Sequence, residues 1–388
     1  MRILAIETSC DETAFAYVEA SGSLENPQFT ILQNIVSSQI EIHRPFGGVV
    51  PNLAKREHLK NLPIIYEEIL QKLNSHAKAT VNELRHPSTV KKSNPSTHQP
   101  INPSPFDLIA VTVGPGLEPA LWTGIEFAKK LSVEQNIPVV GANHMEGHLY
   151  SFLLQSQKEA VKSQISNLNN VFPAVVLVVS GGHTILLKMD SFTSWEKLGE
   201  TRDDAAGEVF DKVARMLKLP YPGGPEIQKL AEKGNATAIQ FPRPMLQDKN
   251  YEFSFSGLKT SVLYYLRDRG FTHTGELGEG DDKKSIPHTL AADVAASFQK
   301  AVIDVLVGKT MRAAKEYDAK SIILCGGVAA NKPLRERLVE EALREKKTFF
   351  APEFEFNTDN AAMIAAAAYM GVLRKNTYPL EADASLSL

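Results

Sequence analysis

Residues 174–188 read AVVLVVSGGHTILLK, and this stretch decides the fold. Its apolar run (174–179) predicts a buried strand, its polar turn lies at 180–183, and an apolar strand returns over 184–188. Residues 2–18, RILAIETSCDETAFAYV, repeat this order, with strands at 2–7 and about 13–18 on either side of a turn rich in acids and hydroxyls. Because each hairpin stands near the start of one half of the chain, the two indicate an internal duplication.

The segments after each hairpin alternate between helix and strand patterns. The first half predicts a helix at 52–73, which Pro63 kinks or restarts, then a strand at 106–113, a helix at 119–134 and a strand at 138–142. The second half predicts helices at about 203–218, 225–233, 257–269 and 289–317, a strand at 321–325, and helices after Asn331 and from about Asp359. This alternation predicts an α/β fold, and the paired hairpins predict duplicated lobes around a cleft.

The chain length fits such a duplicated unit. At ~150 residues per domain, 388 residues favour two domains or one large repeat. We expect an N-terminal lobe at 1–155 and a C-terminal lobe at 171–388 that carries a helical insertion at about 203–290. Residues 74–105 hold five prolines among many Ser and Asn, which predicts a flexible surface insertion.

Composition favours a reduced cytoplasmic protein. The two cysteines, Cys10 and Cys325, cannot form a disulfide framework. The uncharged run at 361–373 is shorter than the ~20 apolar residues of a membrane span, and the early acids are atypical of a signal or transit peptide. The net charge of −3 gives no basic excess, so contact with RNA needs a local patch or a partner protein.

Three glycine pairs stand at turns where a phosphate can approach the backbone. Gly181–Gly182 and Gly326–Gly327 follow buried strands, the latter just before Asn331, and Gly223–Gly224 precede a helix. Without Cβ atoms, backbone N–H groups can converge on an anion, although each pair taken singly is equally a plain hairpin or helix-start turn. Together they favour a nucleotide cleft. The absence of a P-loop lysine motif and of GxGxxG argues against a Walker NTPase and a dinucleotide fold.

Two histidines have the spacing of metal ligands. His144 and His148 are four residues apart, so a helix would present both imidazoles on one face. Asp359 is a candidate third ligand, and the alternative is that it caps the last helix. Without a third ligand, two histidines at this spacing are more often a coincidence. Glu146 points away from the histidine face, which argues against the usual metalloprotease base.

Acidic residues gather at two further places. Asp11 and Glu12 stand at the tip of the first hairpin. Asp204, Glu208 and Asp211 fall at i, i+4 and i+7, which predicts an acidic helix face that either lines the cleft or is plain solvated surface. In the FSFSGLKT segment (253–260), core packing of the two phenylalanines is favoured over base stacking.

Taken in order, these segments resemble the TsaD family, the bacterial tRNA threonylcarbamoyladenosine transferases. The resemblance runs from Ile3 to about Gly371. It is carried by IETSCDET (6–13), GGVVPNLA (47–54), GPGL (114–117), HMEGH (144–148), VVSGGHT (178–184), DDAAGEVFDK (203–212), YPGGP (221–225), FSFSGLKT (253–260), CGGVAAN (325–331) and TDNAAMIA (358–365).

The resemblance implies a fold and an activity. The fold is the duplicated actin-like/sugar-kinase fold (ASKHA, RNase H-like), with a nucleotide between the lobes. The activity is an acyl transfer, in which the threonylcarbamoyl group moves from threonylcarbamoyl-AMP to the N6 amine of adenosine 37, directly 3′ of the anticodon. The tRNAs concerned read codons that start with A, and AMP is released.

The resemblance also implies residue roles. It makes His144, His148 and Asp359 the ligands of one divalent metal per subunit, Fe²⁺ or Zn²⁺, and it places Asp11 and Glu12 beside the reacting carbonyl. The implied substrate-binding residues are Val178, Val179, Ser180, Gly181, Gly182, Asp211, Gly224 and Asn331.

The implied partners are tRNA, a TsaB-like paralogue, a TsaE-like ATPase and a separate threonylcarbamoyl-AMP synthase, with no membrane. Two features depart from the family: the length of 74–105, and Asn357, where many relatives have Cys. Three other readings stay open: an ASKHA-type small-metabolite kinase, a metallopeptidase and a nucleotide-binding scaffold subunit.

Overall fold

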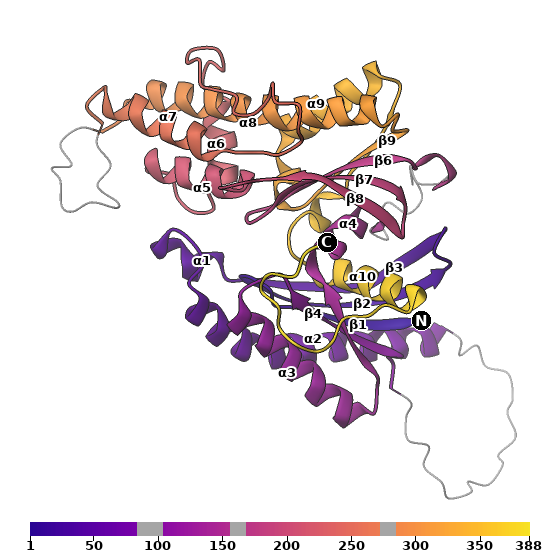
Figure 1. The fold of residues 1–388 in the computed structure, drawn as a ribbon. Helices are drawn as coiled ribbons and strands as arrows, with labels where there is room; N and C mark the ends of the chain where they lie inside the picture. The colour runs from indigo at the N-terminus through magenta and orange to yellow at the C-terminus, as the bar shows by residue number, and fades with distance from the viewer. Residues whose placement is uncertain (84–103, 156–167, 272–284) are drawn as a thin grey trace, which may run out of the picture.

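Two five-stranded sheets, joined and covered by helices, make up the protein (Figure 1). The computed structural model describes residues 1–83, 104–155, 168–271 and 285–388. The first sheet has the order β3-β2-β1-β4-β5 and contains β1 (Arg2–Glu7), β2 (Glu12–Gly22), β3 (Pro27–Ser38), β4 (Leu108–Gly114) and β5 (Val139–Asn143). Its first three strands are antiparallel, whereas β4 runs parallel to β1 and β5 runs parallel to β4.

The second sheet repeats this topology. Its order is β10-β9-β6-β7-β8, and it contains β6 (Ala174–Val179), β7 (Thr184–Ser191), β8 (Ser194–Glu200), β9 (Ser321–Cys325) and β10 (Thr348–Phe350). Again three antiparallel strands come first, and two parallel strands extend the sheet from β6. The duplication predicted from the two hairpins is confirmed, and with it the α/β fold class.

The central strands are apolar throughout because both faces of each sheet are covered. In β1, Leu4 and Ile6 face the outer helices, and Ile3 and Ala5 face the space between the sheets. The outer layer on the first sheet consists of α2 (Pro51–Glu83) and α3 (Glu118–Gln135). On the second sheet it consists of α5 (Ala206–Met216), α6 (Gly223–Ala231), α7 (Ser256–Arg267), α8 (His288–Glu316) and α9 (Lys332–Arg344).

Two helices form an inner layer between the sheets. They are α4 (His144–Tyr150) and α10 (Ala361–Arg374), and they pack against inward residues of both sheets, such as Ala5 and Val176 (Figure 1). The chain after α10 returns to the first sheet, where Tyr378 bridges Gly141. The Asp383 N–H also donates to the Val113 carbonyl at 2.8 Å, so the segment after α10 lies along the first sheet. The predicted division into lobes at 1–155 and 171–388 stays a prediction.

Short helices complete the described chain: α1 (Ile40–His43), η1 (Arg44–Phe46), η2 (Ser151–Leu153), η4 (Leu168–Asn170), η5 (Gly327–Ala330) and η6 (Phe354–Phe356). Within the described ranges, no helix is long and apolar enough to cross a membrane.

Helix α2 differs from its prediction in two ways. It is one helix that continues through Pro63, because Leu62 and Ile65 on either side pack into the same core while Pro63 itself is exposed. It also extends to Glu83, so the first ten residues of the predicted insertion at 74–105 are helical. Residues 84–103 of that prediction lie outside the described residues.

An ion pair joins the two inner helices. Glu146 of α4 accepts hydrogen bonds from Arg374, the last residue of α10, and from the Tyr378 hydroxyl at 2.7 Å. The side chains of Glu146 and Arg374 are only 3% and 12% exposed. The face of α4 opposite the histidines is thereby attached to α10.

Replacing Glu146 by alanine would leave the Arg374 guanidinium buried without its carboxylate. Since breaking a buried pair costs about 3–5 kcal/mol, we expect Glu146→Ala to lower the free energy of unfolding by about that amount in urea denaturation. The matched control is Glu126→Ala, which breaks an exposed pair with Lys129 and should cost less than about 1 kcal/mol. Equal losses in the two variants would contradict this assignment.

Candidate active site

The two histidines project from one face of α4. The helix begins directly after β5, where the Asn143 side chain accepts hydrogen bonds from the backbone N–H groups of Met145 and Glu146 at 2.7 and 3.2 Å. This cap fixes the start of the helix. The rings of His144 and His148 lie 4.7 Å apart between centroids, and both are buried.

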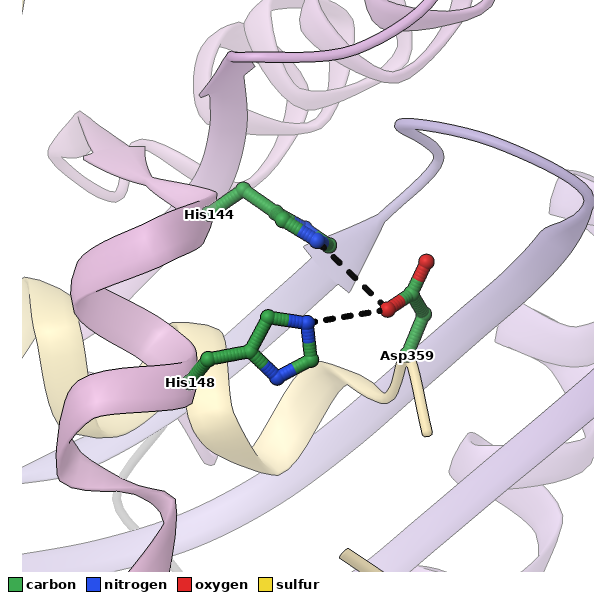
Figure 2. A group of neighbouring side chains, drawn as sticks. All are labelled: His144, His148 and Asp359. Carbon is green, nitrogen blue, oxygen red and sulfur yellow. Dashed lines mark ion pairs between the residues drawn. The ribbon is translucent and has the colours of Figure 1, made fainter. Parts of the chain in front are cut away.

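Asp359 completes the group from the segment before α10 (Figure 2). Its Oδ1 lies 3.2 Å from Nε2 of His148 and 3.5 Å from Nε2 of His144. The alternative role as a helix cap is wrong, because the neighbouring Asn360 caps α10 and accepts the Met363 N–H at 3.1 Å. The carboxylate of Asp359 therefore faces the two histidines instead of capping the helix.

This arrangement fits a metal ion. One potential ligand atom from each of the three residues lies within 4.8 Å of the others. In addition, both ring nitrogens of His148 are buried, and Nδ1 has no hydrogen-bond partner among the described residues. Nε2 of His148 and Oδ1 of Asp359 face each other, and a cation between them would be ligated by both atoms.

The charges within the group are strongly linked. Burial alone would lower the pKa of His144, but the carboxylates of Asp359 and Glu7 outweigh it and raise the pKa to about 9. Burial lowers the pKa of His148. Although burial would raise the pKa of Asp359, the charge of His144 and the hydrogen bond to His148 hold it at about 2. Asp359 is thus ionised over the whole physiological range.

Glu7 lies behind His144 and was missed from the sequence. Its Oε2 is 3.2 Å from Nδ1 of His144, and the Ser9 hydroxyl is also 3.2 Å from that nitrogen. Glu7 is fully buried at the end of β1. The sequence signal that could have revealed Glu7 is its position as an acidic residue at the end of an apolar strand.

The acidic hairpin tip lies near the metal-ligand group. Asp11 is buried, and burial together with the charges of Asp11 and Asp359 raises the pKa of Glu12 well above its usual range. A second residue missed from the sequence, His58 of α2, supports the turn, since its Nε2 is 3.0 Å from the carbonyl oxygen of Cys10.

The first glycine turn is closed by its own backbone. Ser180 N donates to the His183 carbonyl at 2.8 Å, and His183 N donates to the Ser180 hydroxyl at 3.1 Å. A Cβ added at Gly181 or Gly182 would meet no atom of the described chain within 4 Å. The turn thus presents bare backbone to open space.

Val178 and Val179 are placed differently from the other predicted substrate-binding residues. Both are fully buried strand residues whose side chains belong to the two opposite cores of the second sheet. Their side chains therefore point into these cores and away from the open end of the glycine turn.

Of three further predicted residues, Gly224 and Asn331 stand at helix starts, and Asp211 lies within α5 and contacts the start of α6. Asp211 of α5 accepts the Gly223 N–H at 2.6 Å, and a Cβ at Gly224 would also meet nothing within 4 Å in the described chain. Asn331 caps α9 by accepting the Leu334 N–H at 3.0 Å. Burial raises the pKa of Asp211 to about 6, and the charge of Asp11 adds to this effect, so the two acids lie within electrostatic reach of each other.

The predicted acidic helix face holds for Glu208 and Asp211, which both lie on α5, and is wrong for Asp204. Asp204 precedes α5, and its oxygens lie 2.7 Å from the ammonium nitrogens of Lys212 and Lys259. Glu208 also pairs with Lys212. Lysines thus neutralise both acids. Phe253 and Phe255 are fully buried, which confirms that they pack in the core.

The side chain of Asn357 contacts neighbours outside the metal-ligand group. It is buried, accepts a hydrogen bond from Arg335 at 3.0 Å and donates one to the Phe354 carbonyl. Its role is to hold the segment before Asp359.

Fold and site together define an actin-like/sugar-kinase-fold protein with a candidate metal centre between its two sheets. Full-length HypF, solved in its phosphate- and nucleotide-bound form, has a similar fold, with a TM-score of 0.53 at 12% identity. The match covers 99% of this chain and 56% of that one.

Within this class, the chain belongs to the TsaD family. The family model described as "TsaD: tRNA N6-adenosine threonylcarbamoyltransferase" matches residues 30–81 and 98–366. Proteins of that name from Thermosipho melanesiensis and Bacillus subtilis are 44% and 45% identical to it. These matches cover 100% and 95% of this chain, and 99% and 89% of the relatives. The resemblance stated above is therefore confirmed.

Two glycines beside the first turn should respond differently to alanine. A Cβ at Gly207 would lie 2.6 Å from the Ser180 carbonyl oxygen, whereas one at Gly181 meets open space in the described chain. We expect Gly207→Ala to lose about 1–3 kcal/mol of stability through overpacking, and Gly181→Ala to stay within about 0.5 kcal/mol of the parent chain. Urea unfolding of both variants measures the difference. Equal free energies of unfolding would contradict the close approach of Gly207 to the Ser180 carbonyl.

The raised pKa of Asp211 predicts a pH-dependent cost. In the folded chain this group binds its proton up to about pH 6, whereas an unfolded aspartate loses it near pH 4. Asp211 therefore destabilises the fold increasingly as pH rises through that window. The stability of Asp211→Asn relative to the parent chain should rise by roughly 1–2 kcal/mol from pH 4.5 to 7. The prediction is contradicted if the difference in free energy of unfolding between Asp211→Asn and the parent chain does not change with pH.

Proposed function

We propose that this protein is an acyltransferase that completes the threonylcarbamoyl modification of tRNA. It moves the threonylcarbamoyl group from threonylcarbamoyl-AMP to the N6 amine of adenosine 37 in tRNAs that read codons starting with A. Family membership supports the reaction. The observation that carries the proposal for this chain is the His144–His148–Asp359 group, which lies within electrostatic reach of the acidic turn at Glu12.

The metal centre and the reacting groups have separate tasks. His144, His148 and Asp359 would hold one divalent cation, and two imidazoles with one carboxylate suit Fe²⁺ or Zn²⁺ and leave positions open. When bound, the cation supplies Lewis-acid polarisation of the carbamoyl or phosphate oxygen.

The backbone of the glycine turns would bind the adenylate. Gly181, Gly182 and Gly224 present backbone without side chains in the way, which suits an anionic phosphate. Ser180, whose N–H donates to the His183 carbonyl, would shape this turn. Val178 and Val179 would contribute only backbone contacts. Asp211, from the middle of α5, and Asn331, from the start of α9, would orient the nucleoside.

The acidic turn would accept the proton. As the N6 nitrogen bonds to the carbamoyl carbon, the bond from that carbon to the phosphate oxygen breaks and AMP leaves with the electron pair. The amine then loses its proton to the pair Asp11 and Glu12. Because the pKa of Glu12 is raised, the pair is a stronger base than an isolated solvent-exposed carboxylate.

The charge of the chain supports a need for partners. Phosphate contacts supply much of RNA affinity, and a net charge of −3 gives little of it. We therefore propose that tRNA binds together with a TsaB-like paralogue and a TsaE-like ATPase in the cytoplasm. A separate synthase makes the adenylate.

Two other functions share the fold. A small-metabolite kinase and a nucleotide-binding scaffold have no need for the His–His–Asp group. A metallopeptidase needs a base beside the histidines, whereas Glu146 is bound to Arg374 and Tyr378.

The direct test supplies unmodified tRNA, threonylcarbamoyl-AMP and the partner proteins, followed by mass spectrometry of the nucleosides. We expect threonylcarbamoyl-adenosine that depends on this chain, and at least a tenfold lower rate for His148→Ala. The matched control, His288→Ala, removes an exposed histidine and should leave the rate unchanged. Circular dichroism checks that both variants are folded.

Two results would overturn parts of the proposal. Absence of product, with the partners shown active alongside a known family member, would favour the kinase or the scaffold, and ATP-dependent phosphorylation of metabolites would then separate these two. Unchanged transfer by a demonstrably metal-free variant would remove the metal from the mechanism.

A further inference from the structure

We propose that Glu7 is a positioning residue of the metal centre, which holds the Nδ1–H of His144 and thereby fixes Nε2 of His144 as the metal-binding atom. This inference rests on the metal site proposed above. It concerns a residue that touches neither the substrate nor the metal, and that acts only through His144.

The carboxylate of Glu7 is itself rigidly held. It is fully buried at the end of β1. Oε1 accepts the Ser9 N–H at 2.5 Å, and Oε2 accepts the Thr112 hydroxyl at 2.5 Å. With these two donors in place, Oε2 lies 3.2 Å from Nδ1 of His144. The contact is therefore set by β1 and its neighbour β4.

The chemistry of a carboxylate decides which nitrogen carries the hydrogen. An ionised carboxylate can only accept, so Nδ1 of His144 must donate. In the neutral imidazole that binds a metal, Nε2 then keeps its lone pair. This is the nitrogen that faces Asp359, with 3.5 Å between Nε2 and Oδ1. The Ser9 hydroxyl, 3.2 Å from Nδ1, can accept from the same N–H group.

The two histidines differ in this respect. Nδ1 of His148 has no hydrogen-bond partner among the described residues. Its Nε2 faces Asp359 at 3.2 Å, so no carboxylate holds this ring from the side away from the metal site. Glu7 fixes the ring orientation and the tautomer of His144 before a metal binds. Carboxylates behind metal-bound histidines raise the basicity of the ligand, and losing them costs typically 10–100-fold in metal affinity.

Charge balance gives a second reason for Glu7. One divalent cation, the carboxylates of Asp359 and Glu7 and two neutral histidines sum to zero. A buried site with unbalanced charge would pay a large desolvation cost. Glu7 thus supplies the second negative charge without occupying a coordination position.

The test measures Zn²⁺ binding to the full chain by calorimetry, with no reaction involved. We expect Glu7→Gln to weaken binding about 10–100-fold, because its amide carries no charge and its NH₂ can donate to Nδ1 and reverse the tautomer. The matched control is Glu146→Gln, the same change at another buried carboxylate, which contacts Arg374 and Tyr378 and neither histidine. It should bind Zn²⁺ within about threefold of the parent chain.

Each outcome decides a separate point. If Glu7→Gln binds Zn²⁺ with the affinity of the parent chain, the inference is wrong. If this variant also unfolds at lower urea than the parent chain when both are in EDTA, the role of Glu7 is purely structural. If Glu7→Gln does not fold, Glu7→Asp keeps the charge but withdraws it by one methylene, and parent-like affinity there has the same consequence. Failure of the parent chain to bind Zn²⁺ removes the metal site itself. If His148→Ala abolishes Zn²⁺ binding and Glu7→Gln retains it, the metal site is supported and only the role of Glu7 is rejected.

Discussion

The rest of the structure depends on two helices that carry charged side chains between two apolar sheets. An unpaired charge in such a place costs several kcal/mol, so each of these charges needs a partner within the inner layer. Glu146 meets Arg374 on one side of α4, and Glu7 meets His144 on the other. The pairings hold α4 against α10 and β1, and Asp359 is presented just before α10. The contact of Glu7 with His144 lies at the metal-ligand group, whereas the Glu146 pair lies on the opposite face of α4.

Duplication explains why groups from both halves meet. In each sheet the first hairpin and the parallel strands place their turns at equivalent positions, and the acidic turn of one half comes within electrostatic reach of Asp211 in the other. Two hydrogen bonds connect the halves nearby: Arg44 donates to the Tyr221 carbonyl at 3.0 Å, and Arg215 donates to the Gly47 carbonyl. The relative placement of the turns is thus supported by direct contacts as well as by the shared inner layer.

Sequence patterns predicted what depends on local order and missed what depends on packing. The hairpins and the spacing of His144 and His148 are local, and both are confirmed. β3 is half exposed and β10 has three residues, so neither has a strong pattern. No local sequence pattern predicts that α10 returns to the first sheet. A local pattern also does not show the ion pair of Asp204 with the distant Lys259. The same holds for the contact of Glu7 with His144, which is 137 residues away.

The proposed site has a surplus of negative charge, and this bears on how an anionic adenylate could bind. Asp11, Glu12 and Asp359 lie close enough for their charges to raise the pKa of Glu12, and a phosphate would add to the repulsion. A divalent cation at Asp359 would reverse the sign of the field on that side, while the open backbone at Gly181 and Gly182 offers N–H groups without further charge. The acids would then be free to serve the amine, whose developing positive charge they attract. In this arrangement the phosphate binds at the glycine turns and the cation, and the tRNA amine binds at the acidic turn. The leaving group therefore meets positive charge and N–H donors, and the attacking group meets negative charge, at two separate places in the site.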